Sequence, residues 1–405
     1  MMKIKTKNAG IVLMLIYSFF YQAFFTSAII KYSLFAIIFG LLIRNARRVK
    51  FSRDILLWIT FVSYMVVTSK TVGDVPITFA CIVIMGILAT GDNSWDETFI
   101  HTITICTGIH AIITIACCIV PSLHSGVIVP VFFPKLAGRV EMMSVAGFTN
   151  HYSSNGMYLG IGFTIAAINA ICCPRNEKRK AYLWAVVVLV ALILTTKRTH
   201  LVAGVLAVLI VYIIISKQRG EALSGYFKAV FILIVSIGVF IIAAQLIPSL
   251  GIVVNRFVEL GEDDTMHGRT FFYEIAYQNW LSNPIFGTGW GGFSNAFNQT
   301  KLGQAYILNG YGKIQPHNVY LQLLSDLGIV GLLVFLFLVI SAFKSGIKKA
   351  KEYQSEKSMY CCLSILIFWL ICGITGNPLN DVQLFCPFVL ACMLIISNNR
   401  VRFKR

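Results

Sequence analysis

The chain has 405 residues, of which 57% are hydrophobic and only 13% are charged, and its mean hydropathy is +0.77. This composition excludes an ordinary soluble globular protein and is typical of a protein that crosses a membrane many times. The formal net charge of +17 does not indicate nucleic-acid binding, because basic residues of membrane proteins gather in cytoplasmic loops. We therefore expect an all-α polytopic membrane protein.

Apolar runs predict about twelve membrane-spanning helices. They lie near residues 9–25, 28–43, 54–69, 75–90, 98–120, 154–173, 181–196, 199–216, 227–247, 318–342, 358–376 and 380–397. Several runs are shorter than the roughly 20 residues that an upright helix needs to cross a bilayer. The first pair and the pair around residues 195–200 are the least certain spans, since either pair could be a helix hairpin that only dips into the membrane.

Basic residues are distributed unequally between the predicted loops. With the N-terminus in the cytoplasm, the cytoplasmic segments hold 24 Lys and Arg residues and the opposite side holds nine, while Lys31 falls inside a span. The positive-inside rule therefore places both termini in the cytoplasm and the long loop after residue 247 outside it. The acidic loop at 91–97 is the exception, because it lies where the rule expects basic residues.

This topology divides the chain into five regions. They are N-terminal transmembrane helices (1–120), an extracytoplasmic re-entrant or interfacial segment (121–155), central transmembrane helices (154–247), a large extracytoplasmic catalytic loop bearing short helices (248–317), and C-terminal transmembrane helices with a basic cytoplasmic tail (318–405). The first apolar run lacks a convincing cleavage site, so we expect it to be a retained span. The eleven cysteines show no zinc-type spacing, and we expect neither a metal site nor a cofactor.

Polar residues gather at the start of the span near 154–173. The run from Gly147 to Gly156 includes His151 and Asn155. One interpretation is a helix cap with residues that anchor it at the membrane interface. The other is one wall of a polar cavity that binds a sugar.

Two arginines stand at expected helix starts on the same predicted side of the membrane. Arg198 follows Lys197 in a very short connector between two apolar runs, and Arg269 follows Gly268 in the long loop. Arg198 could simply extend its side chain to the lipid headgroups, and Arg269 could be a surface residue. Together they suit a diphosphate, because arginine binds phosphate oxygens through two parallel donors and glycine lets backbone donors approach.

Two further residues in the C-terminal half, His317 and Asp381, are candidates. His317 lies between Pro316 and Asn318, where it could bond the backbone at the interface or act on an acceptor hydroxyl as a near-neutral group. Asp381 could line a substrate site, although capping the last helix is the simpler role. Two arginines and a histidine would supply glycosyl transfer from a diphosphate without a metal.

In combination, these pieces resemble the O-antigen polymerase/ligase superfamily of Wzy and WaaL proteins. The pieces that carry the resemblance are Gly147–Gly156, Thr196-Lys197-Arg198, Gly268-Arg269 with the later Gly287-Thr288-Gly289, and Pro316-His317-Asn318 followed by Ser325–Leu332. The resemblance implies a membrane glycosyltransferase of the GT-C type. It would take a glycan linked to undecaprenyl diphosphate on the outer face of the bacterial cytoplasmic (inner) membrane and transfer it to an acceptor hydroxyl.

The resemblance also implies roles for the candidate residues. Arg198 and Arg269 would hold the diphosphate, and His317 would act near the acceptor. The expected substrate-binding residues are Lys197, Gly268, Asn318, His151, Asn155 and Asp381. The implied partners are the lipid-linked glycan donor, a glycan or lipid-linked acceptor, membrane lipid and a chain-length regulator.

Three activities remain open within this interpretation. A polymerase of O-antigen, capsule or exopolysaccharide repeat units would pass the glycan to another lipid-linked repeat, whereas a ligase would pass it to lipid A–core or another surface acceptor. Lys197 replaces the small residue of the usual ligase pattern, which favours a polymerase. A flippase or transporter for the same lipid would be expected to show two related halves, and the sequence has no internal repeat.

Overall fold

The computed structural model describes all residues except 1–7, 71–73, 93, 135–144, 222–223, 228–263, 309–313, 353–355 and 398–405. Within the described residues the secondary structure is helical and contains no β-strand, which confirms the all-α prediction. In the part of the chain that the structure describes, six helices are long and apolar enough to cross a membrane, and shorter apolar helices accompany them. The number of twelve spans stays a prediction, because the run at 227–247 falls almost wholly outside the described residues.

The other predicted spans coincide with helices to within a few residues, except that α16 continues to Glu352 where the predicted span ends at 342. The first five are α1 (Ala9–Phe24), α2 (Ala28–Leu42), α3 (Arg53–Val67), α4 (Asp74–Ala89) and α5 (Asp96–Ile119), with a 3₁₀ turn η2 (Ile43–Arg48) after α2. The remaining six are α8 (Tyr152–Cys172), α9 (Lys178–Leu194), α10 (Arg198–Gln218), α16 (Val319–Glu352), α17 (Glu356–Thr375) and α18 (Val382–Ile396). Long apolar runs locate these helices well because each one must bury or expose to lipid a continuous apolar surface.

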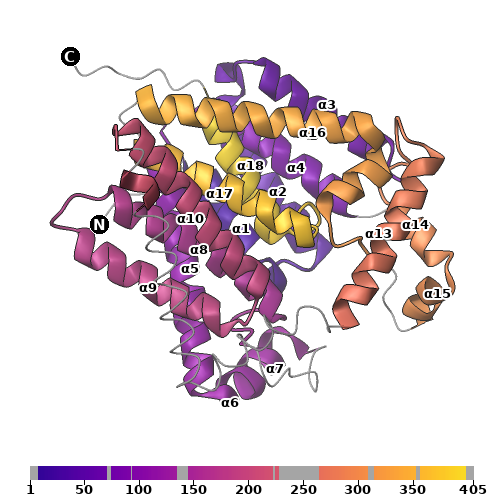
Figure 1. Ribbon diagram of the computed structural model, residues 1–405, viewed down its shortest axis with the longest axis horizontal. Coiled ribbons are helices and arrows are strands. Elements are labelled where there is room, and N and C mark those ends of the chain that lie inside the picture. The colour runs from indigo at the N-terminus through magenta and orange to yellow at the C-terminus, as the bar shows by residue number, and fades with distance from the viewer. Residues whose placement is uncertain are drawn as a thin grey trace.

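Helices α8, α17 and α18 form the centre of the bundle (Figure 1). Every residue of α18 from Gln383 to Ile396 is buried, as expected for a helix that is hydrophobic on all sides. Aromatic rings stack against it from two neighbours: Phe79 of α4 on Phe385 at 3.6 Å and Trp369 of α17 on Phe388 at 4.3 Å between centroids. The peripheral α2 instead exposes large apolar side chains such as Ile29, which is 80% exposed.

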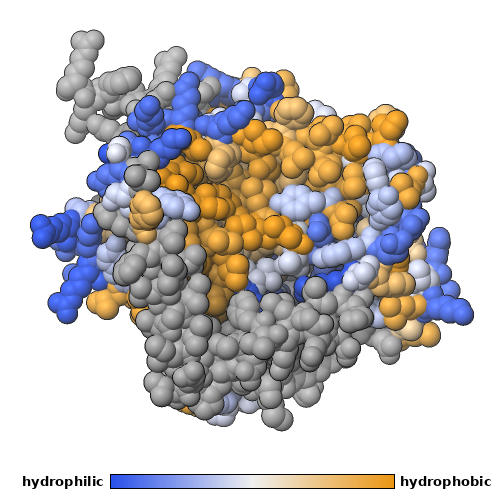
Figure 2. Space-filling view, in the orientation of Figure 1, coloured by the Kyte–Doolittle hydropathy of each residue, from blue (hydrophilic) through white to orange (hydrophobic). Residues whose placement is uncertain are grey.

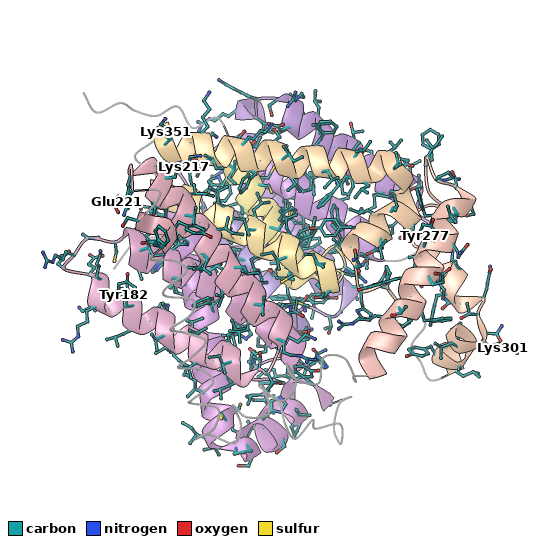
Figure 3. The ribbon with its side chains drawn as sticks, in the orientation of Figure 1. Tyr182, Lys217, Glu221, Tyr277, Lys301 and Lys351 are labelled. Atoms are coloured by element: carbon teal, nitrogen blue, oxygen red, sulfur yellow. The ribbon has the colours of Figure 1, made fainter. Side chains whose placement is uncertain are left out.

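The surface separates into an apolar middle and polar ends. Figure 2 shows hydrophobic residues across the centre of the visible face, with hydrophilic residues gathered at the upper left and at the right edge. Lys217, Glu221 and Lys351 lie at one end of the molecule, and Tyr277 and Lys301 lie towards the other (Figure 3). This arrangement is that of an integral membrane protein, whose apolar belt faces lipid.

The segment after α5 is helical where it is described. It consists of three short pieces, α6 (Pro121–Leu123), the π-helical turn η3 (His124–Ile128) and α7 (Val129–Phe132). Ile128 and Phe133 pack with Cys117 of α5 in a small apolar cluster. The segment therefore folds back against the bundle, and its re-entrant or interfacial position stays a prediction.

Three short helices occupy the described part of the predicted long loop: α13 (Asp264–Ser282), α14 (Gly292–Asn298) and α15 (Lys301–Leu308). They enclose a small core of their own, in which Phe272, Phe293 and Phe297 are buried. Figure 1 shows them together at the right of the molecule, beside the first half of α16. We call these three helices the loop unit; its expected position outside the cytoplasm stays a prediction.

A buried carboxylate attaches the loop unit to α16. Asp326 is fully buried, and its two oxygens accept hydrogen bonds from the backbone N–H groups of Phe293 at 2.8 Å and Gly291 at 3.0 Å. The carbonyl of Asp326 accepts a third bond, from Gly289 N–H at 2.8 Å. Because the two amides belong to the N-terminus of α14, the negative charge also interacts favourably with the positive end of that helix dipole.

Main-chain pairing extends this attachment beyond Asp326. The N–H groups of Ile329 and Val330 donate to the carbonyls of Pro284 and Ile285 at 3.0 and 3.1 Å. Helix α16 is kinked at Gly328, whose φ of 65° and ψ of −169° are not helical. A side chain at Gly328 would collide with the Ile285 backbone, so the close approach of the two chains requires glycine.

Asp326→Ala should loosen the loop unit, because two buried amides lose their acceptor. Each unsatisfied buried group costs about 1–3 kcal/mol, so we expect a loss of about 2–6 kcal/mol. The measurement is the melting temperature of the purified protein, together with protease cleavage between residues 283 and 300. Gln299→Ala, an exposed change in the same unit, serves as the control. An unchanged melting temperature and cleavage pattern in Asp326→Ala would show that the carboxylate does not hold the unit.

Candidate functional site

The connector between α9 and α10 has only three residues, Thr195 to Lys197, as the sequence predicted. Thr196 adopts a left-handed backbone with φ of 54°, which is rare for a β-branched residue. The Thr195 hydroxyl donates to the Leu192 carbonyl at 2.7 Å and accepts from Lys197 N–H at 3.3 Å. The tight turn leaves Lys197 at the N-cap position and half-buried Arg198 as the first residue of α10.

Lys197 is the charge that links several candidate residues. Its ammonium lies 5.4 Å from the centroid of the Tyr152 ring, beside the predicted polar cluster. Burial and the Lys197 charge both lower the pKa of His317, whereas burial raises the pKa of Asp381 and Lys197 opposes that shift. All three groups therefore lie within electrostatic range. Lys197 thus occupies the junction between α8, the segment before α16 and the turn before α18.

His317 and Asn318 form the start of α16. The Asn318 side chain accepts from the backbone N–H groups of Tyr320 and Leu321, both at 3.0 Å, and so caps the helix. His317 has a left-handed backbone with φ of 54°. Its ring lies 5.8 Å from the ring of Phe272, between centroids, and therefore next to α13.

Arg269, which belongs to the loop unit, lies within electrostatic range of His317. Arg269 and Phe272 are three residues apart on α13 and share one face of it. Although the side chain of His317 keeps an exposed surface, partial burial lowers its pKa, and the positive charges of Arg269 and Lys197 lower it further, to about 4. The imidazole is therefore neutral at physiological pH, with two cations within electrostatic range. Gly268 lies in α13 immediately before Arg269.

The polar cluster at 147–156 is partly internal. Asn155 is fully buried, and its amide donates to the Thr114 hydroxyl at 2.8 Å and the Val145 carbonyl at 3.1 Å. His151 stands at the N-cap of α8, where its Nδ1 accepts from Ser153 N–H at 3.1 Å. The visible contacts of both side chains brace the start of α8, and their roles in substrate binding stay predictions.

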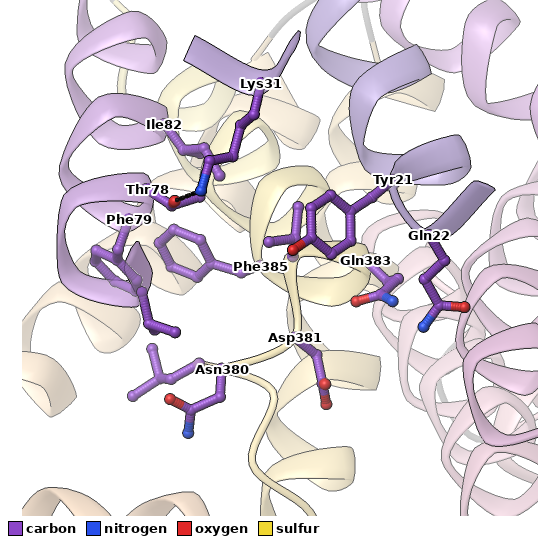
Figure 4. A pocket seen from close by; sticks show the side chains of 13 residues that line it. Tyr21, Gln22, Lys31, Thr78, Phe79, Ile82, Asn380, Asp381, Gln383 and Phe385 are labelled. Carbon is purple, nitrogen blue, oxygen red and sulfur yellow. Dashed lines mark hydrogen bonds between the residues drawn. The ribbon is translucent and has the colours of Figure 1, made fainter. Parts of the chain in front are cut away.

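Asp381 lies in the turn before α18. It occupies the N-cap position, but its carboxylate makes no capping hydrogen bond, so the simpler role expected for it is not the one observed. It lines a cavity of about 210 Å³ instead (Figure 4). Burial raises the pKa of Asp381 to about 7, with Lys197 opposing that shift.

The structure thus brings Lys197, Arg269, His317 and Asp381 into one region and places Arg198 next to Lys197. Sequence reasoning missed the side chains that connect these pieces. Gln22 of α1 donates to the Ser154 hydroxyl at 2.8 Å. Gln322 of α16 accepts from the Asn380 amide at 2.9 Å. Each is a lone polar residue in an apolar run, which was the only signal available.

This arrangement can bind an anion and act on a hydroxyl. Cations supplied by two separate elements, α10 and α13, suit a group with several negative oxygens. A neutral imidazole has a lone pair that can accept a proton from an alcohol. Among the described residues, no group of three or more His, Cys, Asp or Glu side chains is placed to hold a metal ion.

Comparison with known proteins finds a match to a family model over the central part of the chain. Residues 183–336 match the model of a family described as O-Antigen ligase (Wzy_C). The match supports the resemblance derived from the sequence, and its range includes Lys197, Arg198, Arg269 and His317. A search of curated proteins found no match.

The imidazole of His317 should titrate near pH 4 rather than at its ordinary value of 6.5. The unfolded chain then binds more protons than the folded chain between these pH values, so this group makes folding stability rise with pH across that window. The pKa can be measured by NMR of ¹³Cε1-labelled histidine, with His317→Gln used for assignment.

Arg269→Gln should raise this pKa because it removes one of the two cations, whereas the exposed change Lys301→Gln should not. A midpoint at or above 6.5, or no response to Arg269→Gln, would contradict the proposed proximity.

Proposed function

We propose, from the membership of residues 183–336 in the O-antigen polymerase/ligase superfamily, that the protein is a polysaccharide repeat-unit polymerase. Members of this family are membrane glycosyltransferase-like enzymes. The observation that carries the proposal is that the matched residues include both cations flanking His317, namely Lys197 and Arg269. The donor would be a glycan linked to undecaprenyl diphosphate, and the acceptor a second lipid-linked repeat.

The diphosphate of the donor would lie among Arg198, Arg269 and Lys197. Arginine suits this role because its planar guanidinium donates two parallel hydrogen bonds to phosphate oxygens and keeps its charge. Negative charge accumulates on the diphosphate as the glycosidic bond breaks. Cations fixed in place before the reaction stabilise that charge without reorganising during the step.

His317 would receive the proton of the acceptor hydroxyl. In this step the bond between the sugar C1 and the phosphate oxygen breaks, a bond between C1 and the acceptor oxygen forms, and undecaprenyl diphosphate leaves. Burial and, to a smaller extent, the charges of Arg269 and Lys197 make the imidazole a weak base. A bound diphosphate would offset the two charges and raise the pKa of His317, so the imidazole would be a stronger base when the donor is in place.

A ligase is the second candidate, and the description of the matching family favours it. It would use the same donor chemistry and differ in the acceptor, which would be lipid A–core or another surface molecule. A flippase of the lipid-linked glycan is the candidate from a different class. We place the reaction on the outer face of the bacterial cytoplasmic membrane, with both termini inside and a chain-length regulator as a partner.

A product assay separates these functions. Purified protein in lipid receives only the undecaprenyl-diphosphate-linked repeat unit, and a ladder of longer lipid-linked glycans would identify a polymerase. Transfer that appears only after lipid A–core is added would identify a ligase. Movement of the lipid across the bilayer, with neither product, would identify a transporter.

Arg269→Lys should abolish most of the activity, because lysine keeps the charge but loses the two-pronged geometry. One charge-assisted hydrogen bond is worth about 1.5–3 kcal/mol, so turnover should fall roughly tenfold to a hundredfold. The measurement is ladder formation at equal amounts of membrane-inserted protein, with Lys301→Arg as the matched surface control. Wild-type turnover in Arg269→Lys would refute a bidentate role.

Activity should persist in EDTA, because arginine, lysine and histidine side chains supply the charge stabilisation that a metal would otherwise provide. The ladder assay is repeated after dialysis against the chelator, with and without added Mg²⁺. A loss of product that Mg²⁺ restores would mean that the reaction uses a metal.

A further inference from the structure

A polar cavity lies beside the candidate site, between α1, α2, α4 and the start of α18. Its volume is about 210 Å³. The polar side chains that line it are Tyr21, Gln22, Lys31, Thr78, Asn380, Asp381 and Gln383. Figure 4 shows Lys31 and Asp381 on opposite sides of this space, with the ring of Tyr21 between them and to one side.

Lys31 is a buried cation within a membrane-spanning helix. Its side chain is only 3% exposed, and its ammonium donates to the Thr78 hydroxyl of α4 at 3.3 Å (Figure 4). Ionisable side chains within membrane-spanning helices are rare, and they generally pair with another polar group or face a cavity with a function. Lys31 lines such a cavity, and its hydrogen bond to Thr78 positions the ammonium group there.

Hydrogen bonds join the cavity to the candidate site. Gln22, on one wall, bonds the start of α8 by donating to the Ser154 hydroxyl at 2.8 Å and accepting from Asn150 N–H at 3.4 Å. Asn380, on another wall, bonds Gln322 of α16 at 2.9 Å. Asp381 feels the charge of Lys197. A ligand in the cavity would therefore lie next to the groups that surround His317.

We propose that this cavity is the subsite for the acceptor sugar, and that it selects a sugar with a carboxylate, which Lys31 binds. The assignment rests on the proposed glycosyl transfer. Drug-sized ligands occupy about 300–1,000 Å³, so this smaller space suits about one sugar ring. Amide and carboxylate side chains bond sugar hydroxyls, the aromatic ring of Tyr21 packs on the apolar face of the ring, and the ammonium of Lys31 takes the carboxylate.

The test measures binding by saturation-transfer NMR on the full-length protein in nanodiscs. The probes are methyl glucuronide, which carries a carboxylate, methyl glucoside, which does not, and inorganic pyrophosphate. The glucuronide should bind at least tenfold more tightly than the glucoside, since one charge-assisted hydrogen bond separates them. Lys31→Met should remove this difference, whereas Lys301→Met, at an exposed position on α15, should preserve it.

Two further measurements keep the proposal falsifiable. Thr78→Val keeps the charge of Lys31 but removes the hydrogen bond between Lys31 and residue 78. It should therefore weaken glucuronide binding, and it supplies a test even if the Lys31→Met protein does not insert into the membrane. Equal binding of the two glycosides to the wild type, or wild-type selectivity in Thr78→Val and Lys31→Met, would overturn the proposal. Displacement of the glucuronide by pyrophosphate, with pyrophosphate bound more tightly, would make the cavity a diphosphate site instead.

The binding assay and the ladder assay fail independently. Glucuronide binding without any transferase product would show that the cavity binds an acidic sugar, but it would refute the proposed function and, with it, the role as acceptor subsite. Ladder formation without selective glucuronide binding would leave the proposed function standing and refute the subsite. If both succeed, Lys31→Met should raise the KM for an acidic acceptor and leave the KM for the donor unchanged, which a general loss of stability would not do.

Discussion

The candidate site depends on the attachment of the loop unit to α16 through the Asp326 carboxylate. Arg269 belongs to the loop unit, whereas His317 directly precedes α16 and Lys197 precedes α10. The two hydrogen bonds from backbone amides to Asp326 hold the loop unit, and with it Arg269, in register with α16. A buried carboxylate is stable only when hydrogen-bond donors satisfy it. The need to keep both amides bonded therefore holds the N-terminus of α14 in place against Asp326.

Backbone strain occurs at two points of the site, each just before the start of a helix. Among the described non-glycine residues, positive φ angles occur at Thr196 and His317, one before each of the helices that lead away from the site. Each such conformation costs of order 1–3 kcal/mol and persists only when surrounding contacts hold it. Capping by Asn318 and the bonds of the Thr195 hydroxyl supply such contacts. Both strained residues are next to groups with a proposed chemical role, Lys197 and Asn318 among them.

The sequence predicted the helices well and the site only in outline. Continuous apolar runs located the helices because burial in a bundle or in lipid needs such runs. The proximity of Arg269 to His317 could be inferred only by resemblance, since the packing of Phe272 against His317 depends on the folded loop unit. Lys31 was visible as a charge inside a span, but nothing in its own helix shows that Thr78 and Asp381 face the same cavity.

The pairing between residues 284–293 and 325–330 uses mostly main-chain groups, with Asp326 as the main side-chain contribution. Backbone contacts do not depend on the identity of the side chains around them. The outward surface of α13 and α15 can therefore diverge without displacing Arg269. Loop units exchanged between related chains that keep the Asp326 carboxylate and the Gly328 bend would therefore form chimaeras in which the outward surface changes while the anchor for Arg269 is retained.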